Sequence, residues 1–187
     1  MSTNGLLTEK EQELVAVGAS IAAGCRPCTA HHFRAARAAG ADKEEIRQAV
    51  NGALDVRHSA SDIIARLAAK YLGDAPAEEA SHSSEQSLMG ELVSVSAALA
   101  VNCAVSLETH LTAAYQLGAT VRQIQTALGI ARAVKNMAAK KADEAVTKIA
   151  GESQVCADDC GCHTDTNPLS ATSAACSCGD AERAATA

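Results

Sequence analysis

Apolar residues recur with a helical period in two long stretches of the chain, and short polar or glycine-containing segments interrupt each stretch. Thr8-x-x-Glu11 has the spacing of a capping box and predicts a helix that runs to about Ala23. Gly24 and Pro27 then break the pattern. Because proline is favoured in the first turn of a helix, a second helix is expected to begin near Pro27.

The next signals extend this succession of helices. Gly40 ends the second helix, and Asp42-x-x-Glu45 resembles another capping signal. A further, separate helix is expected from about Ser59 to Tyr71. The helix that follows the Asp42 signal carries an apolar stripe made of Ile46, Ala49, Val50 and Ala53.

The same succession occurs twice. Residues 13–53 align without a gap with residues 91–131, at an offset of 78 positions. Such a match indicates an internal repeat, whose units are expected to bury their apolar faces against each other. In the second copy Thr120-x-x-Gln123 provides the capping signal, and a closing helix is expected from about Val134 to Ala150. The identical pairs include Glu13 with Glu91, Cys25 with Cys103, and His32 with His110.

Composition divides the chain into four segments. We expect a first helical repeat at 1–74, a polar linker at 75–84, a second and degenerate repeat at 85–150, and an acidic, cysteine-rich tail at 151–187. Apolar residues form 48% of the chain and aromatic residues only 2%, which is typical of closely packed, alanine-rich helices. The expected fold class is all-α, a duplicated helical repeat with an irregular C-terminal tail.

Charge and hydropathy exclude several classes of partner. The tail holds six acidic residues and one arginine, so most of the net charge of −6 lies there and the repeats are close to neutral. No basic stripe with interleaved aromatic residues is present, which argues against a nucleic acid partner. No apolar run is long enough to span a membrane and no secretory leader is evident, so we expect a cytoplasmic protein without a membrane partner.

Cys25-Arg26-Pro27-Cys28 places two thiols at the predicted start of a helix. In a reducing compartment, eight cysteines indicate catalysis or metal binding rather than a disulfide framework. Unpaired N–H groups at a helix start favour a thiolate, which attacks peroxides and disulfides, and a second sulfur can resolve the product. The pair therefore predicts a redox-active dithiol, with half of a zinc site as the plainer alternative.

Two further residues suit proton transfer. His32 lies four residues after Cys28, on the same face of the predicted helix. Glu13 is followed by eleven residues without a charge, so its carboxylate is expected to be partly desolvated. With Cys25 these residues form the expected catalytic set. His31 points away from their common face and is expected to contact solvent.

The second copy keeps only part of this set. Ser106 replaces the second cysteine, so Cys103 lacks a nearby partner and is expected to be a small, buried, apolar residue. Glu91 and His110 remain, either for packing, for a subunit interface, or for binding something that the first site does not. The redox chemistry is therefore assigned to the first copy.

Glu13, Cys25, Cys28 and His32, followed by Gly40 and the acidic capping turn, resemble the alkylhydroperoxidase D (AhpD) family within the carboxymuconolactone decarboxylase superfamily, over about residues 8–150. The resemblance implies an all-α fold of repeated helical units that assemble as trimers or hexamers. It implies that Cys28 attacks peroxide, that Cys25 resolves the product, and that the glutamate and histidine relay protons, with no cofactor required. The implied partners are a small hydroperoxide or a protein disulfide as substrate, and a peroxiredoxin or a lipoylated protein as electron donor.

Two alternatives concern the dithiol itself. Cys25 is nearer the start of the helix, which favours it as the attacking thiol instead of Cys28. Peroxidases of this family often carry a histidine between the two cysteines, where this chain has Pro27. Disulfide exchange is therefore as plausible a reaction as peroxide reduction.

The tail combines five cysteines with a histidine, a soft ligand set that suits Zn²⁺, Cu(I) or a thiophilic metalloid. The alternatives are a redox tail that exchanges disulfides with the dithiol, and an unstructured extension. The expected metal ligands are Cys156, Cys160, Cys162, His163, Cys176 and Cys178.

The sequence therefore predicts a thiol-dependent oxidoreductase, either a peroxidase or a disulfide reductase. A second hypothesis is a lyase of the carboxymuconolactone decarboxylase branch, which needs no dithiol. A third is a metal- or metalloid-binding protein that acts through its tail.

Overall fold

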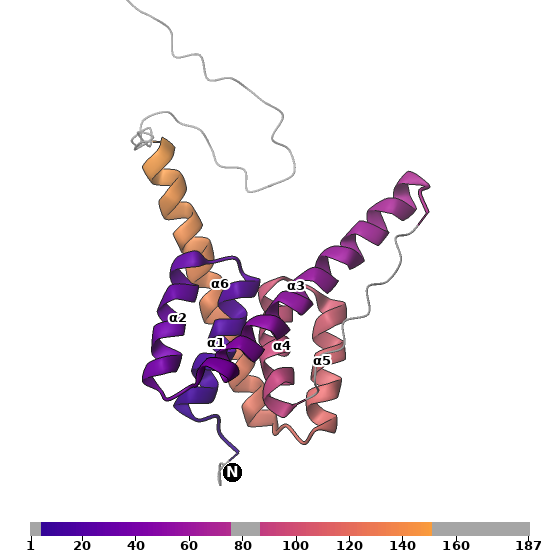
Figure 1. The fold of residues 1–187 in the computed structure, drawn as a ribbon. Helices are drawn as coiled ribbons and strands as arrows, with labels where there is room; N and C mark the ends of the chain where they lie inside the picture. Colours follow the sequence, from indigo (N-terminus) through magenta and orange to yellow (C-terminus); the bar gives the residue numbers. More distant parts are fainter. Residues whose placement is uncertain (1–4, 76–86, 151–187) are drawn as a thin grey trace, which may run out of the picture. The chain divides into compact units, whose positions relative to one another are not determined.

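The computed structural model describes residues 5–75 and 87–150, which contain six helices and no strand (Figure 1). The predicted all-α fold is confirmed. All described residues belong to one compact unit, and the expected linker residues 76–84 and the tail 151–187 lie outside them. The helices are α1 (Glu9–Ala22), α2 (Arg26–Ala38), α3 (Lys43–Leu72), α4 (Leu88–Ala100), α5 (Ala104–Gln116) and α6 (Val121–Ala150).

The two sets of three helices follow the repeat in the sequence. The bounds of α5 and α6 lie 78 positions after those of α2 and α3, and α4 ends 78 positions after α1. Helices α1, α3 and α6 begin at reciprocal capping pairs, in which a side chain and a backbone N–H of each residue bond to the other. The pairs are Thr8 with Glu11, Asp42 with Glu45, and Thr120 with Gln123.

The separate helices predicted from Ser59 and from Val134 are wrong, because α3 and α6 each run unbroken for 30 residues. Neither helix contains a proline. Ser61, whose hydroxyl could cap a new helix, instead donates to the carbonyl of Arg57 one turn earlier, at 3.0 Å. Although both helices are long, no helix in the described ranges is apolar enough to cross a membrane.

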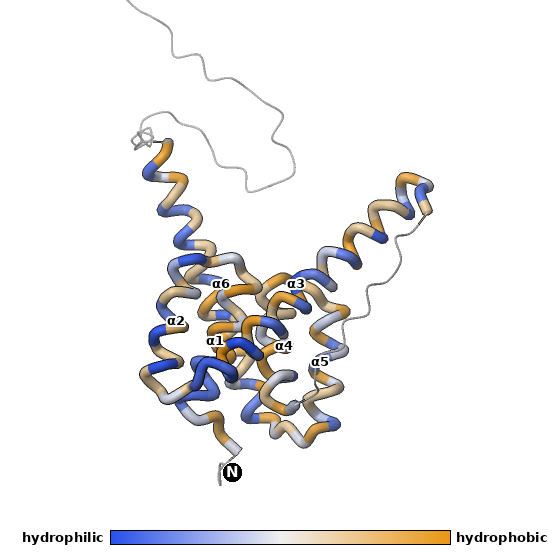
Figure 2. Tube along the Cα trace, in the orientation of Figure 1, coloured by the Kyte–Doolittle hydropathy of each residue, from blue (hydrophilic) through white to orange (hydrophobic). Residues whose placement is uncertain are grey.

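Two apolar helices, α1 and α4, form the centre of the unit. They pack against each other, and each also contacts both α3 and α6. Residues 14–20 of α1 and 91–98 of α4 are all buried, as expected for helices that are apolar on every side (Figure 2). Because α6 packs on α1, and α3 on α4, each repeat helps to enclose the other.

Small residues allow the central helices to approach closely. At Gly18 of α1, an added Cβ would lie 2.6 Å from Cγ1 of Val93 on α4. The hydroxyl of Ser96 on α4 donates to the carbonyl of Val15 on α1 at 3.0 Å, so a buried hydrogen bond also joins the two repeats. Helix α6 also packs on α1, where the predicted site lies.

Candidate active site

The predicted dithiol lies at the N-terminus of α2. Gly24 has a φ of +68°, which costs glycine little, and it turns the chain between α1 and α2. Cys25 is the N-cap of α2, and its sulfur accepts a hydrogen bond from the N–H of Cys28 at 3.3 Å. The two cysteines form a disulfide, and each is only 6% exposed. Once that disulfide is reduced, the N–H groups of the helix end favour a thiolate.

Arg57 of α3 holds this turn from the other side. Its Nη1 donates to the carbonyls of Ile21 and Ala22, at 3.1 and 3.3 Å, in the last turn of α1. Carbonyls at a helix C-terminus lack partners within the helix, and the negative end of the dipole favours a cation there. The arginine therefore anchors the segment that immediately precedes Gly24 and Cys25.

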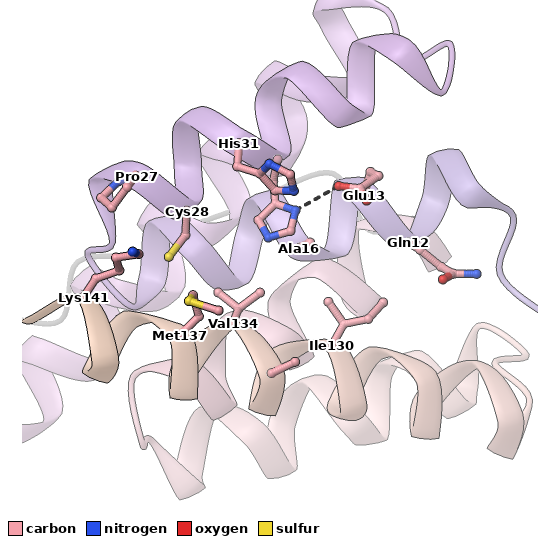
Figure 3. A pocket seen from close by; sticks show the side chains of 12 residues that line it. Gln12, Glu13, Ala16, Pro27, Cys28, His31, Ile130, Val134, Met137 and Lys141 are labelled. Carbon is pink, nitrogen blue, oxygen red and sulfur yellow. Dashed lines mark hydrogen bonds and ion pairs between the residues drawn. The ribbon is translucent and has the colours of Figure 1, made fainter. Parts of the chain in front are cut away.

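The predicted proton-relay residues form a direct pair. The carboxylate Oε2 of Glu13 on α1 lies 2.9 Å from Nδ1 of His32 on α2, a hydrogen bond drawn as the dashed line in Figure 3. The two side chains are 25% and 19% exposed, so the carboxylate is partly desolvated as expected. A carboxylate that accepts from Nδ1–H fixes the imidazole orientation and leaves Nε2 as the nitrogen that exchanges protons.

A pocket of about 540 Å³ joins this pair to the dithiol (Figure 3). The side chain of Cys28 points across it toward α6, where Met137 and Lys141 lie opposite. The wall from α6 is mainly apolar, whereas the walls from α1 and α2 carry the polar groups. The lining residues are Gln12, Glu13, Ala16, Pro27, Cys28, His31, His32, Ile130, Ala133, Val134, Met137 and Lys141.

Comparison with known proteins gives one match. Residues 1–71, which hold the dithiol and the Glu13–His32 pair, match the family model described as the carboxymuconolactone decarboxylase family. Over these residues the chain is similar to that family. The match confirms the resemblance at the level of the superfamily, and neither the curated proteins nor the solved structures include a significant match.

The second repeat lies beyond the matched carboxymuconolactone decarboxylase segment, yet it keeps the carboxylate–imidazole pair. Oε2 of Glu91 lies 2.8 Å from Nδ1 of His110, and Glu91 is only 5% exposed. Cys103 is the N-cap of α5 and its sulfur accepts from the Ser106 hydroxyl at 3.1 Å. Cys103 is a free, partly exposed thiol, so the prediction that it is a buried apolar residue is wrong.

Several residues of the pocket escaped the sequence analysis. His31 is exposed as expected, but it also lines the pocket, with its ring centroid 5.0 Å from that of His32 in an edge-on arrangement. Met137 and Lys141 of α6 are the other important additions. They lie more than a hundred positions from Cys28, and no local signal links them to it. Only the packing of α6 on α1 brings them there.

No metal site accompanies the dithiol in the described part of the chain, where no group of three or more His, Cys, Asp or Glu side chains is placed to hold a metal ion. The plainer zinc interpretation of Cys25 and Cys28 therefore gains no further ligands among residues 5–75 and 87–150. The predicted tail ligands Cys156, Cys160, Cys162, His163, Cys176 and Cys178 lie outside the described residues.

Proposed function

We propose that this chain, which is similar to the carboxymuconolactone decarboxylase family over residues 1–71, is a thiol-dependent oxidoreductase that reduces small organic hydroperoxides. The observation that carries the proposal is the arrangement of one pocket: Cys28, half of a disulfide with Cys25, lines it together with the hydrogen-bonded Glu13–His32 pair. A nucleophilic sulfur, a resolving sulfur and an oriented base are the parts that such a reaction needs.

In the proposed cycle the Cys28 thiolate attacks the distal oxygen of the hydroperoxide. The O–O bond breaks, Cys28 becomes a sulfenic acid, and the alkoxide leaves as an alcohol after taking a proton. His32 supplies that proton through Nε2, while Glu13 stabilises the imidazolium through Nδ1. Cys25 then attacks the sulfenic sulfur, which forms the disulfide and releases water.

The dimensions of the pocket favour a small substrate over a protein disulfide on this side. Cys28 is 6% exposed and lies within a pocket of about 540 Å³. The apolar side chains of Ile130, Val134 and Met137 provide a surface for the organic part of a hydroperoxide. A folded protein substrate would need to place its own sulfur in this recess.

The disulfide must be reduced again in each cycle. A peroxiredoxin or a lipoylated protein, as the family resemblance implies, would supply the two electrons. Such a donor fits a cytoplasmic location, where thiols are kept reduced.

A lyase activity is the second candidate, because one observation favours it. The carboxylate–imidazole pair recurs at Glu91 and His110, in a copy where Ser106 stands in place of a second cysteine beside Cys103. A pair of this kind can move a proton on a carbon acid without any thiol. Turnover of a carboxylated lactone that persists when Cys25 and Cys28 are both replaced by serine would favour this candidate.

We also propose that the chain assembles with further copies of itself. Large apolar side chains lie exposed on the C-terminal halves of α3 and α6, among them Ile64, Tyr71 and Ile149, at 64%, 83% and 88%. Exposed apolar surface of this kind marks an interaction site. Sedimentation of the full chain should therefore give a mass above that of one copy, and Ile64→Lys with Tyr71→Lys should lower it.

The proposed peroxidase function can be tested on the reduced full chain by adding cumene hydroperoxide and mapping disulfides by mass spectrometry. We expect rapid formation of the Cys25–Cys28 disulfide, its loss in Cys28→Ser, and no change in the matched control Cys103→Ser. Hydroperoxide consumption that is as fast in Cys28→Ser as in the unaltered chain would overturn the proposal.

A further inference from the structure

The two cysteines of the dithiol line different cavities. Cys28 lines the pocket that also holds Glu13 and His32, whereas Cys25 lines a second, adjoining groove of about 610 Å³. That groove lies between the start of α2 and the C-terminal half of α6. Hereafter it is called the Cys25 groove.

The charged residues that line the Cys25 groove are mostly basic. Arg26, Lys141 and Lys148 contribute three positive charges, and Glu144 contributes one negative charge. Nζ of Lys141 donates to the Glu144 carboxylate at 2.7 Å, and this hydrogen bond is the main cause that lowers the pKa of Glu144. With Glu144 ionised, the lining keeps an excess of positive charge beside Cys25.

Comparison of the repeats shows that two of these cations have no charged counterpart at the matching position. At the offset of 78 positions, Arg26 corresponds to Ala104 and Lys141 corresponds to Ile63. The second repeat therefore lacks the charge of Arg26, and Lys141, which itself belongs to the second repeat, matches an apolar position on α3 of the first repeat. Lys148 differs, since its counterpart Lys70 is also a lysine.

We propose that the Cys25 groove binds the reductant, and that this reductant presents its thiol together with negative charge. The inference rests on the proposed function. It adds a second binding site and specifies the sign of the charge on the reductant. Positive charge that lines a recess raises the local concentration of anions, and this effect weakens as salt is added.

The geometry assigns the attack to Cys25. A reductant thiolate in the groove bonds to the Cys25 sulfur, the Cys25–Cys28 bond breaks, and Cys28 leaves as a thiolate at the N-terminus of α2. A second reductant thiolate attacks the reductant sulfur of the mixed disulfide and releases Cys25. Two thiols are oxidised to one disulfide, the protein disulfide is reduced to two thiols, and the two protons lost by the reductant balance those taken up by the cysteines.

This arrangement separates the two half-reactions in space. The hydroperoxide meets Cys28 in the pocket with the apolar wall, and the reductant meets Cys25 in the basic groove. Lys141 lines both cavities, so it lies at the boundary between them.

The test compares two small thiols, 2-mercaptoethanesulfonate, which is anionic, and 2-mercaptoethanol, which is neutral. The rate at which each reduces the Cys25–Cys28 disulfide of the oxidised full chain is followed by mass mapping of that peptide pair, at low and at high salt. At low salt we expect the sulfonate to reduce the disulfide about threefold to tenfold faster than the neutral thiol does. The ratio of the two rates should fall toward one at about 0.5 M salt.

The variants decide where the preference arises. Lys141→Gln combined with Lys148→Gln should bring the ratio of the two rates close to one, whereas the matched control Lys70→Gln on α3 should keep it. Trapped mixed disulfides should lie on Cys25. An unchanged ratio in the double variant, or trapping on Cys28, would overturn the inference.

Failure of this inference can be told apart from failure of the proposed function. If the neutral thiol reduces the disulfide normally and reduced Cys28 still consumes hydroperoxide, the function stands and only the anionic groove is wrong. If Cys28 does not react with hydroperoxide, the function itself is wrong whatever the ratio of the two thiols.

Discussion

Glu13 and His32 are joined by a hydrogen bond of 2.9 Å between Oε2 and Nδ1, and the chain makes the same bond again at 2.8 Å between Glu91 and His110. In both copies the carboxylate comes from the first helix of the repeat and the imidazole from the second. The carboxylate–imidazole pair is therefore a feature of both repeats. The dithiol is what distinguishes the first copy from the second.

Glu13→Gln should slow oxidation of the dithiol by hydroperoxide. Glutamine keeps the shape but removes the charge that stabilises the His32 imidazolium, and general acid–base assistance of this kind contributes about 100-fold. Stopped-flow mixing of reduced protein with cumene hydroperoxide gives the rate. Glu91→Gln is the matched control and should leave the rate within about twofold; an equal loss in both variants would assign the pair a purely structural role.

Glu91 should matter more for stability than Glu13. Glu91 is 5% exposed, so Glu91→Ala removes a buried hydrogen bond to His110 and leaves a cavity, at a cost of about 2 kcal/mol in the free energy of unfolding. Glu13→Ala, at a side chain that is 25% exposed, should cost less. Urea unfolding followed by circular dichroism measures both, and a larger loss for Glu13→Ala would contradict this account.

Ser106→Cys should rebuild a dithiol in the second repeat. The Ser106 hydroxyl already lies 3.1 Å from the Cys103 sulfur, and Cys103 has the same N-cap position in α5 that Cys25 has in α2. Mass mapping after mild oxidation should show a disulfide between Cys103 and the introduced cysteine. If Cys103 stays a free thiol under conditions that oxidise Cys25 and Cys28, the N-termini of α2 and α5 are not equivalent, and the prediction is wrong.

The crossing of α1 and α4 should tolerate no added methyl group at Gly18. A Cβ there would lie 2.6 Å from Cγ1 of Val93, so Gly18→Ala should destabilise the protein by about 1–3 kcal/mol. Gly129→Ala is the matched control, because no atom lies within 4 Å of the added Cβ and alanine favours a helix by about 0.5–1 kcal/mol. The midpoint temperature of thermal unfolding should fall in Gly18→Ala and rise in Gly129→Ala.

Much of the fold could be predicted because its signals are local. The capping pairs at Thr8 and Asp42 mark helix starts through contacts within one turn. The repeat drew attention to Glu13 and His32, and the structure joins them by a hydrogen bond that the sequence did not predict. The continuity of α3 was missed because a separate helix was expected from about Ser59, whereas the nearby Ser61 hydroxyl donates to the carbonyl of Arg57 within one unbroken helix.

The far wall of the pocket could not be predicted from the sequence. Met137 and Lys141 reach the dithiol only because α6 packs on α1. No periodicity in α6 specifies which helix it will cover. The same packing places Lys141 between the two cavities of the site.

The most direct test of the central claim is to trap the sulfenic acid in Cys25→Ser. Without the resolving sulfur, the oxidised Cys28 should persist, and dimedone added with the hydroperoxide should label it in peptide-resolved mass spectra. The account predicts a stoichiometric adduct on Cys28 in Cys25→Ser and little or none on Cys25 in Cys28→Ser. An adduct that forms faster on Cys25, or none on Cys28, would contradict it.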